Sequence, residues 1–191
     1  IDEEVALTDE QKAQNIIAAI ENLPLDITLA NETTINDIKN QYDSLSDEAK
    51  LLVTNYQKLE EAIYQINQLK TQLTNKKQEA ISELNDYLNL DNYSSVNQNL
   101  ITTYINTMIS QINDVQSFDS IDELVIEAKH KLDEFLTIEE ELLAYKEESI
   151  EDLEATIDVL LYSEENKQKI HTLLEEAKSL IYNEAKSNDE V

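Results

Sequence analysis

Carboxylates are the side chains in this sequence with the most obvious capacity for chemistry. The chain has 191 residues, of which 41 are Asp or Glu and 14 are basic, giving a formal net charge of −27. Many of the acids fall three or four residues apart, which places two carboxylates on one face of a helix. Such a pair could act as a general acid and base or bind a divalent cation. The acids are spread evenly, with 14, 14 and 13 of them in residues 1–75, 76–142 and 143–191, so we interpret them as solvated helix faces.

One spacing in the sequence is typical of a metal site. Glu127 and His130 form the E-x-x-H pattern found in carboxylate-bridged di-iron bundles. Such a site needs a second copy of the pattern and two further glutamates, but His171, the other histidine, follows Gln168 at that spacing. Glu127 and His130 also flank the apolar stripe of their helix instead of lying in it. We therefore expect no metal and no cofactor.

The nine tyrosines are the remaining candidates for a functional surface, because a tyrosine ring and hydroxyl together suit contact with protein or sugar. Five of them occupy apolar-seam positions and are predicted to pack in the core: Tyr42, Tyr56, Tyr93, Tyr104 and Tyr162. The other four are the candidate protein-contact residues: Tyr64, Tyr87, Tyr145 and Tyr182. No Ser/His/Asp grouping, glycine-rich phosphate loop or zinc-ligand spacing is present, so we expect a protein that is not an enzyme.

The composition predicts an all-α protein. The chain has no Gly, no Cys and one Pro, and its 14 basic residues are all Lys. Without Gly, hairpin turns and phosphate loops lack the backbone freedom they need, whereas helices tolerate the absence. The strong negative charge disfavours nucleic acid and anionic membrane surfaces as partners. No apolar run approaches the roughly 18 residues that would suggest direct insertion into a membrane.

The first half of the chain is predicted to contain three helices. A capping box at Thr8 and Gln11 begins the first helix, and Pro24 prevents it from continuing. The second helix starts near Asn31. A third starts at Ser46 and is expected to run unbroken to near Asn89, a length of about 65 Å. Its apolar seam has a nearly heptad spacing. The seam residues are Leu52, Tyr56, Leu59, Ile63, Ile66 and Leu73, followed by Lys77, Ile81, Leu84 and Leu88.

The second half repeats this pattern. A helix starts at Ser94, and a capping box at Ser120 and Glu123 opens another helix that is expected to run unbroken to Leu160. The last helix starts at Ser163, and its buried side is predicted to carry Ile170, Leu174, Ala177 and Ile181.

An internal repeat supports this organisation. At an offset of 69 residues, Ile81, Leu84, Tyr93, Ile101, Ile105 and Ile112 match Ile150, Leu153, Tyr162, Ile170, Leu174 and Ile181. With two residues fewer, Asp122-Glu123-Leu124 matches Asp189-Glu190-Val191. We therefore predict tandem three-helix bundles joined by long continuous helices, in a spectrin-like elongated rod. The predicted domains are residues 1–75 and 76–142, each a three-helix bundle, and residues 143–191, a partial third bundle of two helices.

Two segments resemble known modules. Residues 22–62, NLPLDITLANETTINDIKNQYDSLSDEAKLLVTNYQKLEEA, are similar to helical repeat modules of secreted or wall-anchored surface proteins of Gram-positive bacteria. These modules have an L-P-x-x-I-T-L segment, a helix and then Y-D-x-L-x-x-x-x-K-x-x-V-x-N-Y-x-x-L. Residues 120–137, SIDELVIEAKHKLDEFLT, resemble the closing helix of another common surface repeat. The resemblance implies an extracellular stalk or adhesin region at the bacterial cell surface or cell wall, and it implies no catalytic residues.

These observations leave two main hypotheses for function. The first is a structural spacer or stalk that holds flanking domains of the same parent chain away from the cell wall. The second is a helical adhesin-type module that binds a host or cell-surface protein. An intracellular coiled-coil scaffold is a further alternative. Because the sequence begins at Ile1 without Met, we expect it to be a segment of a longer protein.

Overall fold

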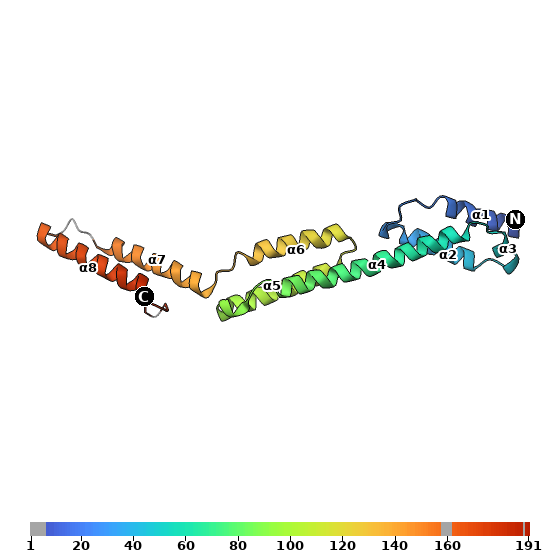
Figure 1. Ribbon diagram of the computed structural model, residues 1–191. Helices are drawn as coiled ribbons and strands as arrows, with labels where there is room; N and C mark the ends of the chain where they lie inside the picture. The colour runs from blue at the N-terminus through green and yellow to red at the C-terminus, as the bar shows by residue number, and fades with distance from the viewer. Residues whose placement is uncertain (1–6, 158–161, 189) are drawn as a thin grey trace, which may run out of the picture. The chain divides into compact units, whose positions relative to one another are not determined.

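The computed structural model describes residues 7–157, 162–188 and 190–191, and all of its regular secondary structure in these ranges is helical (Figure 1). The prediction of an all-α protein is therefore confirmed. The elements are α1 (Asp9–Glu21), η1 (Leu29–Asn31), α2 (Glu32–Asp43), α3 (Asp47–Leu52), α4 (Tyr56–Asn85), η2 (Leu90–Asn92), α5 (Ser95–Asp114), α6 (Phe118–Leu132), α7 (Ile138–Thr156) and α8 (Glu164–Asn183).

The chain divides into two compact units. The first consists of Ile1–Glu83 and Ile109–Val125, and the second of Leu84–Met108 and Ile126–Val191. Helices α4, α5 and α6 therefore each contribute residues to both units. The three-segment division expected from the sequence remains a prediction.

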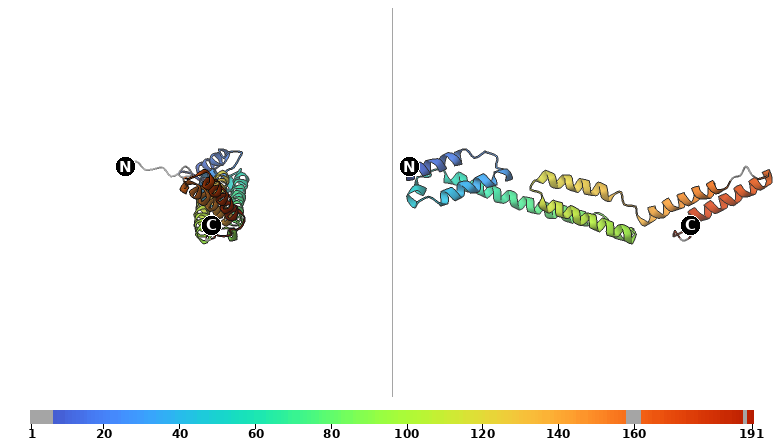
Figure 2. Two further views of the ribbon diagram at one scale, coloured as in Figure 1. Left: turned by 90° about the vertical axis from the view of Figure 1, so that its left-hand side faces the viewer. Right: turned by 180° about the vertical axis from the view of Figure 1, so that it is seen from behind.

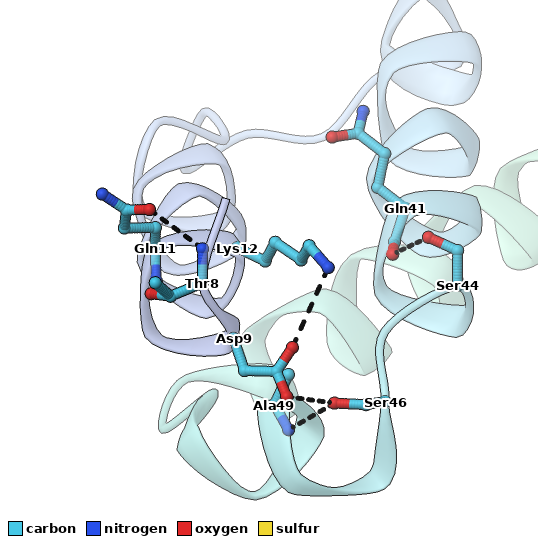
Figure 3. A network of polar contacts seen from close by, with 8 residues as sticks. All are labelled: Thr8, Asp9, Gln11, Lys12, Gln41, Ser44, Ser46 and Ala49. Carbon is cyan, nitrogen blue, oxygen red and sulfur yellow. Dashed lines mark hydrogen bonds and ion pairs between the residues drawn. The ribbon is translucent and has the colours of Figure 1, made fainter. Parts of the chain in front are cut away.

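The first unit contains a dense apolar core at its N-terminal end, where α1 packs against α2 and α3. The predicted start of α1 is confirmed, because the Thr8 hydroxyl accepts from the Gln11 backbone N–H and the Gln11 side chain accepts from the Thr8 backbone N–H. Figure 3 shows the neighbouring Asp9 carboxylate lying between Lys12 of α1 and Ser46, the N-cap of α3, whose hydroxyl donates to it at 2.9 Å. The buried core residues are Ala13, Ile16, Ile20, Leu23, Ile35, Ile38, Val53, Leu59, Ala62 and Ile66.

The helix expected to run unbroken from Ser46 is interrupted at Val53–Asn55, so that prediction is wrong at its N-terminal end. The interruption is tied to α1: the Asn55 side-chain amide donates to the Ile17 carbonyl at 3.0 Å, and the Lys58 ammonium donates to the Glu21 carbonyl at 3.0 Å. The Glu21 carbonyl belongs to the last turn of α1, whose carbonyls lack intrahelical partners, so the Lys58 contact supplies it with a donor.

The change of direction at Val53 also changes which residues face the core. Leu52, predicted as a seam residue, is exposed, whereas Ala49 and Val53 are buried. Beyond the interruption α4 continues without a break through Lys77, as expected, and ends at Asn85, slightly before Asn89.

Helix α6 begins three residues earlier than the predicted capping box. The Ser117 hydroxyl accepts from the Ser120 backbone N–H at 3.1 Å, so Ser117 occupies the capping position and Ser120 lies in the first turn. The apolar stripe of α6 is buried at Ile121, Val125 and Ala128. The predicted start of α5 just after Ser94 is confirmed.

The prediction of an unbroken helix from Ser120 to Leu160 is also wrong, because α6 ends at Leu132 and a separate helix, α7, begins at Ile138. The cause is a capping box at the start of α7: the Thr137 hydroxyl accepts from the Glu140 backbone N–H at 3.3 Å, and Glu140 accepts from the Thr137 backbone N–H at 2.8 Å. A capping box satisfies donors that only a helix start leaves free. Leu160 lies outside the described residues.

Helices α7 and α8 lie side by side as a helical hairpin, in Figure 1 and in the view from behind in Figure 2. The predicted buried side of α8 is only half-buried, at Ile170, Leu174, Ala177 and Ile181. Within the described part of this hairpin the buried residues are Lys146 and, just after α8, Ala185. A pair of helices can cover each apolar stripe from one side only, so half-burial is the expected result.

Candidate protein-contact surface

The structure places Glu127 and His130 on the outside of α6. Glu127 is exposed, and the side chain of His130 is 84% exposed with its Nδ1 atom 3.8 Å from Glu134 Oε1. Among the described residues no cluster of three or more His, Cys, Asp or Glu side chains could hold a metal ion. The two residues therefore behave as part of a solvated helix face.

Tyr87 is one of the four candidate contact residues and lies in the second unit. Side chains of that unit hold it in place. It lies in the turn after α4, and its hydroxyl donates to Asp133 Oδ1 at 2.8 Å. The Lys129 ammonium lies 5.0 Å from the centre of its ring. The hydrogen bond to the Asp133 carboxylate raises the pKa of Tyr87. These contacts give Tyr87 a role in attaching the C-terminal end of α6.

Tyr145 lies on α7 and Tyr182 on α8 of the α7–α8 hairpin. The Lys146 ammonium, next to Tyr145, donates to the Tyr182 backbone carbonyl at 3.1 Å. Both tyrosine side chains are exposed, Tyr145 to 41% and Tyr182 to 47%. Tyr64 is also exposed, and it lies on α4 in the first unit.

The tyrosines predicted to pack in the core divide into two groups. Tyr93 is buried, Tyr104 is half-buried, and the rings of Tyr42 and Tyr56 stack with their centroids 4.1 Å apart. Tyr162 is the exception, because it is 47% exposed beside the start of α8. That part of the prediction is wrong.

Exposed leucines add to the tyrosines on the hairpin. Leu173 and Leu180 project from α8 and Leu143 from α7, and each is at least 46% exposed. An open hollow of about 550 Å³ is lined by Leu153 of α7, by Ala177, Leu180 and Ile181 of α8, and by Glu184, Ala185, Glu190 and Val191, which follow α8. Sequence reasoning assigned none of these leucines to a contact surface. The internal repeat could have drawn attention to Leu173, because at the 69-residue offset Leu173 corresponds to Tyr104.

The same lysine-to-carbonyl contact occurs at the equivalent place in both copies of the repeat. In the first copy the Lys77 ammonium of α4 donates to the Asn113 carbonyl of α5 at 2.7 Å. In the second copy Lys146 of α7 donates to the Tyr182 carbonyl of α8 at 3.1 Å. Lys146 and Tyr182 lie 69 residues after Lys77 and Asn113, so the offset found in the sequence also relates two tertiary contacts.

Hollows in the first unit are lined by side chains that are already paired. The larger, of about 520 Å³, is bordered by Lys70 and Lys77. Lys70 forms an ion pair with Glu32 at 2.5 Å, and Lys77 donates to Asn113. These cations stabilise contacts between helices of the unit and point to no ligand.

Comparison with known proteins yields no match: neither a protein-family model, nor a curated protein, nor a solved structure is similar to this chain. None of the helices in the described ranges combines the length and the apolar character required to cross a membrane.

Proposed function

We propose that this chain is a non-enzymatic structural spacer built from tandem three-helix units, within a bacterial extracellular surface protein. The observation that carries the proposal is the repeated lysine contact, in which Lys77 and Lys146 bind carbonyls 36 residues further along the chain. A unit that recurs in sequence and in its tertiary contacts is the hallmark of a repeat array.

The helix connections support a spacer with two kinds of junction. Helix α4 passes without interruption through Lys77, which lies at the predicted boundary between the first two three-helix bundles. A helix shared by two neighbouring bundles would give each of them an interface with the next and so raise the stability of both. At the following junction residues 133–137 replace the expected helix with a short capped linker.

The placement at a bacterial cell surface is supported by the resemblance of residues 22–62 to surface-protein repeats. In that setting the partners of the spacer are the flanking domains of its parent chain, and its function is to separate them. The charge of −27 suits such a segment, because mutual repulsion of acidic faces disfavours collapse of one unit onto another.

Small-angle X-ray scattering of the chain tests this proposal. A compact domain of 191 residues has a radius of gyration of about 16 Å. We expect a value well above this, with a distance distribution extended to one side. A radius near the compact value would overturn the spacer function.

A second candidate function is a binding module for a host or cell-surface protein. It is favoured by the exposed apolar and aromatic side chains on α7 and α8, including Tyr145, Leu173 and Leu180. Contiguous apolar patches of several hundred Å² on a soluble protein commonly mark an interaction site. An apolar dye that binds to the wild-type chain and not to a Leu173→Glu/Leu180→Glu variant would support it, whereas equal binding to both would count against it.

A further inference from the structure

We propose that Ser94 and Asn97, at the start of α5, form a latch that fixes the direction of α7, and that opening the latch turns residues 133–137 into a hinge. The inference rests on the proposed spacer function, because the direction of α7 determines where the spacer leads the chain. It starts from the linker that separates α6 from α7.

The linker is weakly packed. In residues 133–137 every side chain is exposed or half-buried, and Ile138, the first residue of α7, is 49% exposed. Segments with few buried apolar contacts are the ones that change conformation at low cost in free energy. The direction in which α7 leaves the linker therefore depends on polar contacts.

Asn97 holds the end of the linker. Its side-chain amide nitrogen donates to the Leu136 carbonyl at 3.0 Å and to Glu141 Oε1 at 2.9 Å. Leu136 precedes the N-cap residue Thr137, and Glu141 lies in the first turn of α7. One amide thus contacts the chain on both sides of the point at which α7 begins, which restricts rotation of α7 about the linker.

Ser94 adds a donor to the same carboxylate. Its hydroxyl donates to Glu141 Oε1 at 3.4 Å and accepts from the Asn97 backbone N–H at 3.4 Å, so the two residues of the latch also support each other. The contacts of Ser94 and Asn97 with Glu141 are partly buried. Hydrogen bonds to an ionised carboxylate are stronger than those between neutral groups, and partial burial reduces competition from water.

The start of the linker is held separately, by the turn that precedes α5. Asp133, the first residue after α6, accepts from the Tyr87 hydroxyl at 2.8 Å. Burial raises the pKa of Tyr93, and the carboxylates of Glu140 and Asp133 act in the same direction. Carboxylates from both ends of the linker therefore lie near Tyr93. With the start of the linker tied to Tyr87, the latch at its other end determines the direction of α7.

A latch of side chains differs from a continuous helix in what its opening requires. Helix α4 keeps its direction through backbone hydrogen bonds, so a sharp change of direction would interrupt the helix. The bonds from Ser94 and Asn97 to Leu136 and Glu141 can break while α5 and α7 keep their own backbone hydrogen bonds. The linker is therefore a place where the spacer can change direction reversibly.

Distances between two spin labels test the latch. The chain has no Cys, so Thr102→Cys on α5 and Glu151→Cys on α7 allow specific labelling of two exposed sites in the second unit. Double electron–electron resonance then measures the distribution of distances between the labels. We expect one narrow peak in the chain that carries no other change, because the latch holds α7 in one direction.

Two variants open the latch. Asn97→Asp keeps the shape of the side chain and replaces its donor with a second carboxylate facing Glu141. An acid in the first turn of α5 also suits the helix dipole, so that helix should remain intact. Asn97→Ala/Glu141→Ala removes the side-chain contacts of the latch and leaves Ser94 to cap α5. Losing a hydrogen bond to a carboxylate changes a population about tenfold, so we expect the population outside the narrow peak to rise by at least this factor.

Asn166→Asp is the matched control. Asn166 lies 69 residues after Asn97, in the first turn of α8, and it is exposed. The same charge is thus added at the start of another helix in the same unit, away from the latch. The distance distribution should stay as narrow as in the chain without this change, and circular dichroism should show the same helicity for every variant.

Four results would overturn the proposal. A broad distribution in the chain with an intact latch would show that α7 already moves freely. A narrow distribution in both Asn97 variants would show that other contacts fix α7. Equal broadening by Asn166→Asp and Asn97→Asp would make added charge the cause. Loss of helicity in both Asn97 variants would make these contacts part of the fold instead of a latch. Both labels lie within one unit, so failure here is separate from failure of the spacer function, which scattering measures on the whole particle.

Discussion

The two copies of the repeat use nearly the same sequence pattern and reach different degrees of burial. Ile101 and Leu84 are fully buried in the first copy, whereas their counterparts Ile170 and Leu153 are half-buried. The lysine-to-carbonyl contact between the two helices is present in both. A helix pair can thus form with its own internal contacts while the burial of its apolar face depends on a third helix.

The largest expected difference between the copies is in the cost of removing an apolar side chain. We expect Ile101→Ala to lower the free energy of unfolding by about 3 kcal/mol, because it leaves a cavity in a closed core. Ile170→Ala should lose only about 1 kcal/mol, since half of that side chain is already in water. Native-state hydrogen exchange, read separately for α5 and α8, measures both. Equal losses would show that the hairpin is as well packed as the first copy.

Removing the repeated lysine contact should destabilise the second copy more than the first. The difference should be smaller than the one expected for the apolar substitutions. Lys146→Met removes the donor to the Tyr182 carbonyl at a site only 8% exposed, and we expect a loss of about 2 kcal/mol. Lys77→Met removes the equivalent donor to Asn113 from a half-buried site and should lose about 1 kcal/mol. Exchange rates of amides in α8 and α5 report the two effects. A greater loss from Lys77→Met would contradict the idea that burial sets their strength.

Removing the capping box at Thr8 or the one at Thr137 should lower the free energy of unfolding by similar, smaller amounts. Thr8→Ala and Thr137→Ala each leave backbone N–H groups without an acceptor at the start of a helix, for an expected loss of about 1 kcal/mol. Thr71→Ala is the control, because Thr71 is exposed in the middle of α4 and bonds only to its own helix. Thermal melts followed by circular dichroism compare the three variants. The idea that Thr137 begins a separate helix fails if its variant behaves like the control.

The smallest expected effect is a difference in pH dependence between the capping box at Thr137 and the one at Thr8. Hydrogen bonds from Thr137 lower the pKa of Glu140 from its ordinary value of 4.5, whereas Gln11 in the other box does not titrate. The Glu140 contribution is therefore fully present above pH 4.5 and is lost as the pH falls through the lowered pKa. Exchange at the start of α7 should quicken in this range while exchange at the start of α1 follows the ordinary rate. Glu140→Gln should remove the difference, and persistence of the difference in that variant would exclude the carboxylate as its source.

The sequence was sufficient to predict the helices that begin with a clear cap. Thr8 with Gln11 and Ser94 mark helix starts at the expected positions, because each cap satisfies free backbone donors wherever the helix packs. Ser163 also precedes a helix as expected, although its side chain makes no capping hydrogen bond. Thr137 with Glu140 is the same kind of signal. It was passed over because the apolar spacing continued across it, and apolar spacing alone does not show that the backbone is continuous.

The interruption at Val53–Asn55 could not be predicted in the same way. Its cause is a tertiary contact between Asn55 and the Ile17 carbonyl, 38 residues apart in the chain. Side-chain amides occur in helices and in turns alike, so the type of residue carries little information. The exposure of Leu52 follows from this contact and was missed for the same reason.

The candidate contact surface was predicted only in part. Tyr145 and Tyr182 were chosen because they fall outside the apolar seam, and the structure places both on the α7–α8 hairpin. Leu173 and Tyr162 were missed because seam spacing identifies an apolar face without indicating whether another helix covers it. The repeat held the missing information, since it shows which face α6 covers in the first copy.

Lys146 is buried and donates to the Tyr182 carbonyl, so the rate at which its amine is acylated can report how often the α7–α8 hairpin opens. An acylating reagent can reach the exposed Lys169 of α8 while the two helices stay together, but it must wait at Lys146 until they separate. Once modified, that nitrogen is neutral and bulkier and cannot return to its former place. Mass-spectrometric timing of this one acylation would therefore count how often the pair of helices opens.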